Sequence, residues 1–271
     1  MSKIHSTAII AEGTSLGKEV EIGPYCYVGD DVSLRENVRL LSHVVIEGKT
    51  TIGQGTTIYP FSSIGHIPQD IKYKGEEESR LEIGEHVVIR EHVTINPGTK
   101  GGGGITRIGN HGFFMVGCHI AHDCIVGNHV IMANNAVVAG HCDIGDYAVF
   151  GGKSSIRQFA HVGRYSFIAG HAGVTGDVIP FCSTMGYPSE LTGLNAIGLK
   201  RHDFGKERIR KIWKIYQTLF SDKGQLSDRI EEVRSKFSDN PDAVEILNFI
   251  KNSQCHVIQP RKGASRGQPE T

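Results

Sequence analysis

An aliphatic residue stands at every sixth position over most of this chain, and this period limits the possible folds more than any other feature. An α-helix places apolar residues three and four apart and a half-buried strand places them two apart, so neither produces it. The series slips by one residue after Ile64 and again after Ile95. Its positions are Ile4, Ile10, Leu16, Ile22, Val28, Leu34, Leu40, Ile46, Ile52, Ile58, Ile64, Ile83, Ile89, Ile95, Ile108, Phe114, Ile120, Val126, Met132, Val138, Ile144, Phe150, Ile156, Val162, Ile168 and Val174.

Other positions of the six-residue unit repeat as well. Glycine often follows the aliphatic residue, as in Ile22-Gly23 and Ile144-Gly145, and the fourth residue after it is small, as in Cys26 and Ala136. Repetition at a six-residue step is typical of parallel β-helices, in which three units would close one triangular coil of 18 residues. The sequence therefore predicts a mainly β protein, with a three-sided β-helix over residues 1–187.

From Pro188 onward, helical patterns replace the six-residue repeat. Apolar residues at helical spacing predict an amphipathic helix over 208–220, and two more helices over 227–237 and 241–250, with Ser227 and Asn240 as caps. A shorter helix is expected within 189–200. We thus expect a small α-helical C-terminal domain over 188–259, followed by a disordered tail over 260–271 that has little to bury.

Composition argues against several classes of protein. The formal net charge is zero, so no general attraction to nucleic acid or to an anionic membrane is indicated. No apolar run is long enough to span a membrane and no leader precedes the first repeat, which predicts a cytoplasmic protein. Cys124 and Cys142 would stack on adjacent coils, and we interpret them as reduced core residues rather than a disulfide.

Two segments interrupt the repeat. Residues 66–81 form a polar loop, which composition alone leaves equally compatible with a functional flap and a tolerated insertion. The glycine-rich run at 99–104 lacks the Gly-Lys-Ser/Thr ending of a phosphate-binding loop. We interpret this second segment as a flexible bulge.

Histidine, with 14 copies, is the residue type that offers chemistry. His122, Gly140 and Gln158 are spaced 18 apart and would form a column on successive coils, with His141 beside it. An imidazole can remove a hydroxyl proton and a glycine N–H can stabilise an oxyanion. The column therefore predicts an acyl-transfer site in which Asp123 orients His122; a chance stack in a histidine-rich chain is the alternative.

A metal site is a rival use of these histidines. Trimeric β-helix proteins of the gamma-carbonic-anhydrase type hold zinc with three histidines, two of which are five residues apart, and zinc readily binds imidazole. Here His119 and His122 are three residues apart. We therefore predict a site without a metal.

Several motifs of this chain occur together in one family. They are Ala121-His122-Asp123-Cys124, Ala133-Asn134-Asn135-Ala136, Ala139-Gly140-His141, Gln69-Asp70-Ile71-Lys72-Tyr73, Gly193-Leu194-Asn195 and Gly198-Leu199-Lys200-Arg201. With them the chain resembles the acyl-[acyl-carrier-protein]–UDP-N-acetylglucosamine O-acyltransferases over nearly its whole length. The resemblance implies a left-handed β-helix, although crossovers in sheets are usually right-handed.

The same resemblance implies a function. It implies a homotrimer with sites between subunits, which transfers an (R)-3-hydroxyacyl group from acyl carrier protein to the 3-hydroxyl of UDP-N-acetylglucosamine. This is the first step of lipid A biosynthesis, in a Gram-negative-type bacterium. No cofactor is implied, because a thioester is already an activated acyl donor. The acyl length, and a 3-hydroxyl as against a 3-amino acceptor, stay open.

The resemblance also assigns roles to single residues. His122 would be the general base and the Gly140 N–H would bind the oxyanion. Gly170 matches the position of an acyl-chain ruler, where a small residue implies a long acyl group. The residues implied to bind the sugar, the phosphates or the acyl and pantetheine arm are Gln69, Asp70, Lys72, His119, His141, Gln158, Asn195 and Arg201.

The chain departs from the family pattern at four positions. Asn96 and Arg157 stand where the family often has histidine, Ile197 where it has glutamate, and His202 where it has a second arginine. Since Ile197 and His202 lie in the implied nucleotide-binding segment, we expect the uridine contacts to differ.

A basic segment follows, with seven Lys and Arg residues within 200–214. It predicts a docking surface for an acidic carrier protein, with a solvated helix face as the alternative. Two other functions remain. Another hexapeptide acyltransferase, such as the glucosamine N-acyltransferase, would carry an additional N-terminal domain, and a non-catalytic scaffold would not need the His122–Asp123 pair.

Overall fold

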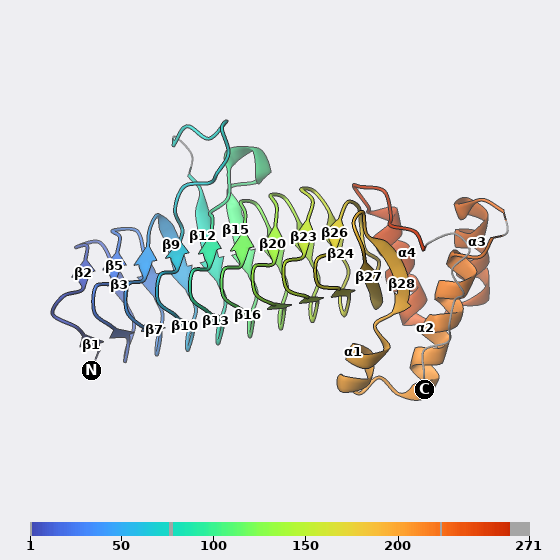
Figure 1. The fold of residues 1–271 in the computed structure, drawn as a ribbon, viewed down its shortest axis with the longest axis horizontal. Helices are drawn as coiled ribbons and strands as arrows, with labels where there is room; N and C mark the ends of the chain where they lie inside the picture. The colour runs from blue at the N-terminus through green and yellow to red at the C-terminus, as the bar shows by residue number, and fades with distance from the viewer. Residues whose placement is uncertain (1, 76–77, 223, 261–271) are drawn as a thin grey trace.

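Short parallel strands wind into a three-sided prism in this computed structural model, which describes residues 2–75, 78–222 and 224–260 (Figure 1). Each predicted aliphatic residue is the last residue of a strand, and nearly all of them point into the core, as Val28 and Leu34 do; Ile4, on the first coil, is exposed. Three sheets, here called A, B and C, receive successive strands in turn. The winding is left-handed, which confirms the predicted fold class.

The strands of the three sheets have the following bounds. Sheet A contains β1 Lys3–Ile4, β4 Glu21–Ile22, β7 Arg39–Leu40, β10 Thr57–Ile58, β13 Val88–Ile89, β16 Phe113–Phe114, β19 Ile131–Met132, β22 Val149–Phe150, β25 Phe167–Ile168, β27 Cys182–Met185 and β28 Glu190–Leu194. Sheet B contains β2 Ile9–Ile10, β5 Tyr27–Val28, β8 Val45–Ile46, β11 Ser63–Ile64, β14 Thr94–Ile95, β17 His119–Ile120, β20 Val137–Val138, β23 Ser155–Ile156 and β26 Gly173–Val174. Sheet C contains β3 Ser15–Leu16, β6 Ser33–Leu34, β9 Lys49–Ile52, β12 Arg80–Ile83, β15 Ile105–Ile108, β18 Ile125–Val126, β21 Asp143–Ile144 and β24 His161–Val162.

Strand pairing follows the predicted coil. Ile4 pairs with Ile22, and Ile120 pairs with Val138, so residues 18 apart in sequence lie on neighbouring coils. At the two phase slips, the four-residue strands β9, β12 and β15 pair over their full length. The insertions therefore leave the register of the coils intact.

Most histidines of the prism stand at corners, where the backbone turns with a positive φ. Their rings stack from coil to coil together with Tyr and Phe, with ring centroids about 5 Å apart. One ladder contains His86, His111, His129, Tyr147 and Tyr165. The abundance of histidine is thus largely a stacking feature of the corners.

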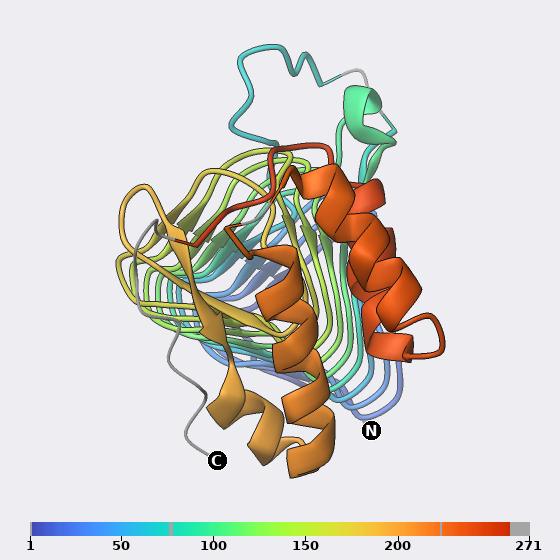
Figure 2. The ribbon, with the colours of Figure 1, turned by 90° about the vertical axis from the view of Figure 1, so that its right-hand side faces the viewer.

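Both insertions leave the prism at the same edge, the one between sheets B and C, and project from it together (Figures 1 and 2). The first follows β11 and the second follows β14. The second was predicted to be a flexible bulge, and this is wrong. It contains a 3-10 turn, η1 (Lys100–Gly102), closed by hydrogen bonds from the N–H groups of Gly102 and Gly104 to the Thr99 carbonyl.

The C-terminal part covers one end of the prism with a hairpin and four helices (Figure 2). The helices are α1 Ala196–Arg201, α2 Lys206–Leu219, α3 Leu226–Lys236 and α4 Pro241–Lys251. Three of them confirm the predicted amphipathic helices, and Asn240 caps α4 as predicted. Two details differ from the prediction. Residues 190–194 form strand β28 rather than helix, because they pair with β27, and Gln225 rather than Ser227 caps α3 through a capping box.

The predicted domain boundary after residue 187 falls at the tip of the β27–β28 hairpin. Of the predicted disordered tail, only Pro260 belongs to the described residues; the rest lies outside them. In the described part of the chain, none of the helices combines the length and apolar character needed to cross a membrane.

Two arginine–carboxylate pairs hold α4 in place. Arg164, at a corner of the prism, binds Glu245 with two hydrogen bonds of 2.5 and 2.6 Å. Arg208 of α2 binds Asp242 with two of 3.0 and 2.7 Å, and the side chain of Asp242 is only 3% exposed. Bidentate pairs of this kind fix orientation as well as contact.

Arg208→Ala should lower the free energy of unfolding by about 2–3 kcal/mol, because it leaves the buried Asp242 carboxylate without its partner. Arg210→Ala is the matched control. Arg210 belongs to the same helix but lies 3.9 Å from exposed Glu207, so its loss should change stability by less than about 0.5 kcal/mol. Urea unfolding would measure the free energy of unfolding of both variants. Equal losses in Arg208→Ala and Arg210→Ala would contradict the role given to the Arg208–Asp242 pair.

Candidate active site

His122 and Asp123 form a hydrogen-bonded pair at the corner between β17 and β18. Nδ1 of His122 lies 2.7 Å from Oδ2 of Asp123, and the exposed fractions of the two side chains are 15% and 0%. Asp123 has a φ of 59°, which turns the chain and points the carboxylate inward. Because a carboxylate accepts, the proton of a neutral His122 ring lies on Nδ1, and in that form Nε2 has a free electron pair.

The second insertion covers the Asp123 carboxylate. Thr99 donates its N–H to Oδ1 and its hydroxyl to Oδ2, each at 2.7 Å. From the coil below, the Thr106 hydroxyl accepts the Asp123 N–H at 2.8 Å. Gly102 lies against the carboxylate so closely that an added Cβ would come within 2.0 Å of Cγ. The carboxylate is therefore both buried and fixed.

Gly140 lies one coil beyond His122, as predicted from the spacing. The N–H of His141 donates to the carbonyl of His122 at 3.0 Å, and the N–H of Phe159 donates to the carbonyl of Gly140 at 3.1 Å. A Cβ at Gly140 would lie 2.7 Å from Cε1 of His122, so glycine leaves room for the imidazole. Within the part of the chain that the structure describes, the Gly140 N–H has no hydrogen-bond partner.

His122, Gly140 and Gln158 thus occupy equivalent corner positions on three successive coils of one edge, and Gln158 is exposed there. Beside this column, His141 stands 3.7 Å from Oδ2 of Asp123 and stacks on Phe159. Burial lowers the pKa of His141, although the Asp123 carboxylate opposes this shift. Its imidazole is accordingly suited to hydrogen bonding in the neutral form.

His119 lies on the outward face of β17, next to the corner. Its Nδ1 lies 2.7 Å from the Thr94 hydroxyl on the coil below. Burial, and then the neighbouring His122, lower the pKa of His119. His119, His122 and His141 therefore gather at one edge, and two of them favour the neutral form.

The loop of the first insertion stands over the same edge. Asp70 is near enough to act on the charge of His141, and its carboxylate accepts the N–H of Lys72 at 3.0 Å. Gln69 and Lys72 are exposed on this loop. Asn96 holds the base of the loop, because its side-chain amide donates to the carbonyls of His66 and Ile67.

Three predicted site residues lie elsewhere in the chain. Gly170 is exposed at the corner between sheets A and B, a different edge of the prism. Asn195 caps α1, where its side chain accepts the N–H of Gly198 and donates to the carbonyl of Tyr165. Arg201 is exposed at the end of α1.

Sequence reasoning missed Thr94, Thr99 and Gly102. Thr99 begins the glycine-rich run, and a run of that length between two strands was the available signal that a backbone approaches something closely. His202 stands where the family has a second arginine, and its ring packs edge-on against Tyr147 and Tyr165.

The ligand atoms of His122, Asp123 and His141 lie within 4.8 Å of one another, a grouping that could hold a metal ion. The hydrogen bonds argue for a different use. Both oxygens of Asp123 already accept from Thr99, and Oδ2 also accepts from His122. A metal bound at Oδ2 would have to displace the Thr99 hydroxyl or His122, so the hydrogen bonds favour a proton-transfer pair.

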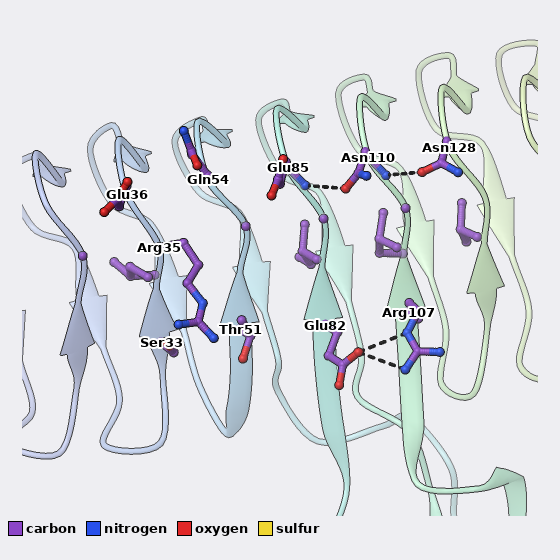
Figure 3. A pocket seen from close by; sticks show the side chains of 18 of the residues that line it. Ser33, Arg35, Glu36, Thr51, Gln54, Glu82, Glu85, Arg107, Asn110 and Asn128 are labelled. Atoms are coloured by element: carbon purple, nitrogen blue, oxygen red, sulfur yellow. Dashed lines mark hydrogen bonds and ion pairs between the residues drawn. The ribbon is translucent and has the colours of Figure 1, made fainter.

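A hollow of about 980 Å³ lies on the face of sheet C, away from this edge (Figure 3). Its lining includes the corner glycines Gly84 and Gly109. Glu82 and Arg107 form an ion pair across it at 3.0 Å. Its described lining includes no histidine, so the hollow does not provide the groups of an acyl-transfer site.

Comparison with known proteins shows the family to which this chain belongs. The family described as "Udp N-acetylglucosamine O-acyltransferase; Domain 2" matches residues 177–258. The acyl-[acyl-carrier-protein]–UDP-N-acetylglucosamine O-acyltransferase of Rickettsia bellii is 55% identical over 93% of this chain and 89% of that protein. The enzyme of the same name from Thermodesulfovibrio yellowstonii is 47% identical over 96% and 100%.

Solved structures agree as well. LpxA from Acinetobacter baumannii superposes with a TM-score of 0.91 at 39% identity, covering 94% of this chain and 99% of that one. UDP-N-acetylglucosamine acyltransferase from Campylobacter jejuni gives 0.90 at 38%, covering 96% and 100%. Fold and site thus define a hexapeptide-repeat, left-handed β-helix acyltransferase. Within that class, the chain belongs to the acyl-[acyl-carrier-protein]–UDP-N-acetylglucosamine O-acyltransferase family.

The lowered pKa of His119 predicts a loss of stability in acid. The unfolded state, with an ordinary histidine pKa of about 6.5, binds the proton more readily than the folded state. The stabilising contribution of neutral His119 is therefore present above about pH 6.5, and it is lost as the pH falls through the pKa of His119 in the folded state. Urea unfolding between pH 7.5 and 5 should show a smaller decrease for His119→Gln than for the wild type. His5→Gln, at the exposed first corner, should keep the full decrease.

Proposed function

We propose that this protein transfers an (R)-3-hydroxyacyl group from acyl carrier protein to the 3-hydroxyl of UDP-N-acetylglucosamine, in the cytoplasm, as the first step of lipid A biosynthesis. The names of its relatives support the reaction. The observation that carries it is the His122–Asp123 pair one coil below the N–H of Gly140, which has no partner among the described residues. Together these groups offer a base and an oxyanion donor one coil apart.

The chemistry follows from the geometry. Nε2 of His122 takes the proton of the sugar hydroxyl as its oxygen attacks the thioester carbonyl carbon. The carbonyl oxygen gains negative charge, which the Gly140 N–H stabilises. When the carbon–sulfur bond breaks, the carrier thiolate receives the proton back from His122. Asp123 keeps the imidazole in the tautomer with Nδ1 protonated and stabilises its transient charge.

The neighbouring groups would hold the substrates. His119, His141 and the loop with Gln69, Asp70 and Lys72 surround the base and suit sugar hydroxyls and phosphates. Gln158, one coil beyond Gly140, suits the acyl or pantetheine arm. Neutral histidines can donate and accept at once, which fits hydroxyl recognition.

The distribution of the remaining residues supports a homotrimer. Gly170 lies on another edge of the prism, and Asn195 and Arg201 belong to the segment that packs beside the third edge, between sheets C and A, so one chain alone does not bring them to His122. If edges of neighbouring chains met, the acyl chain could run past Gly170 of one subunit while Asn195 and Arg201 bind the nucleotide phosphates. Closed cyclic symmetry makes each such site equivalent.

Replacing the base tests the proposal directly. His122→Ala should lower kcat by about 10²- to 10⁴-fold, because the reaction loses its proton acceptor. Purified protein would be incubated with UDP-N-acetylglucosamine and a series of 3-hydroxyacyl carrier proteins, with products read by mass spectrometry. His5→Ala, at the other end of the prism, is the control and should keep the full rate. Undiminished transfer by His122→Ala would contradict the role of His122.

The basic face of α2 is the proposed contact for the acidic carrier protein. Lys211 and Lys214 are exposed there, whereas Arg208 is engaged with Asp242 and is a poor probe of docking. Lys211→Glu with Lys214→Glu should raise the KM for the acyl carrier protein about tenfold at low salt, and less at high salt. Lys18→Glu, at the opposite end, should leave it unchanged; an unaltered KM in the double variant would remove α2 from the docking surface.

A further inference from the structure

Thr99 uses its hydrogen bonds in an unusual way for a residue at the start of a helical turn. Its φ of −125° and ψ of 160° are those of an N-cap, and threonine is a preferred capping residue. A capping hydroxyl accepts an N–H of its own turn, but the Thr99 side chain makes no such bond. Its hydroxyl and its N–H both donate to Asp123, which lies on the next coil.

The backbone holds these two donors in place. The Thr99 carbonyl accepts from Gly102 and Gly104, which closes the turn. Both ends of the insertion are tied to Arg80, whose N–H donates to Gly104 and whose carbonyl accepts from Gly98. Thr99 itself is 7% exposed. The donors are therefore part of the scaffold and need no rearrangement to meet the carboxylate.

Two imidazoles compete for this carboxylate. Oδ2 of Asp123 lies 2.7 Å from Nδ1 of His122 and 3.7 Å from Nδ1 of His141, so a modest rotation of the carboxylate would alter which ring it binds. Thr99 supplies one donor to each oxygen and so opposes the rotation. Gly102 packs against the carboxylate on a further side.

We propose that Thr99 is a positioning residue that commits Asp123 to His122 rather than to His141, and thereby selects which imidazole acts as the base. The inference rests on the proposed acyl transfer. It gives the second insertion a role in the reaction without contact to the substrate. Its consequence is that the tautomer of His122 depends on a hydroxyl on another coil.

Thr99→Val removes the hydroxyl and keeps the shape and the N–H. We expect kcat to fall about 10- to 100-fold with little change in either KM, because a hydrogen bond to a charged group is lost. Thr99→Ser restores the hydroxyl and should return kcat to within about threefold of the wild type. If Thr99 served packing alone, both variants would have a lower melting temperature, and kcat would not differ between Thr99→Val and Thr99→Ser.

A readout without substrate separates this inference from the proposed function. In ¹⁵N-histidine-labelled full-length protein, the His122 signals, assigned by their absence in His122→Gln, should show Nδ1 protonated and Nε2 bare. Thr99→Val should shift them toward a mixture of tautomers. If the wild type transfers no acyl group, the proposed function fails, and these spectra still decide the role of Thr99.

Gly102→Ala is a second variant, in case Thr99→Val does not fold. It retains both Thr99 donors but pushes on the carboxylate, so it should produce the same mixture of tautomers. An unchanged His122 tautomer in the folded variants, or a kcat of Thr99→Val equal to that of the wild type, would overturn the proposal.

Discussion

The ladder of backbone hydrogen bonds between consecutive coils is the interaction on which the rest of this structure depends. Each strand contributes only two residues in most places, so no strand is stable alone, and stacking of coils about 4.8 Å apart supplies the order. The same hydrogen bonds fix the position of each coil relative to the next. Because Ala121 donates to Val138 and Ala139 donates to Ile156, the corners that follow must lie above one another. The column of His122, Gly140 and Gln158 is a direct product of this repetition.

The corners use one backbone conformation for two purposes. A positive φ costs free energy for most side chains, and the stacked His, Tyr and Phe rings offset this cost through contact with the next coil. At Asp123 the same conformation turns a carboxylate inward, where the second insertion covers it. The edge of the proposed site is therefore a stacking edge in which Asp123 occupies the position of one ring.

The sequence was sufficient for features that repeat and insufficient for features that depend on a single distant contact. Strand positions, the 18-residue coil and the column at His122 follow from the period, since every coil enforces the same register. Strand β28 looked helical because its partner β27 is not visible in local sequence. At Thr99 the only signal in the sequence is the glycine-rich run that it begins, because its significance comes from Asp123, which lies 24 positions further along the chain. The hand of the coil came only from resemblance, because the period is the same for either hand.

The location of the site follows from where a β-helix can accept extra residues. Two-residue strands pair on both sides, so an insertion can leave only at a corner if the ladder is to continue. Both insertions leave at the B–C edge and stand over it, which provides walls and hydrogen-bond donors that a plain corner lacks. The other two edges carry stacked rings but neither of these insertions. The proposed site therefore lies at the one edge where the repeat is interrupted, and the continuous repeat on the neighbouring faces holds its residues in register.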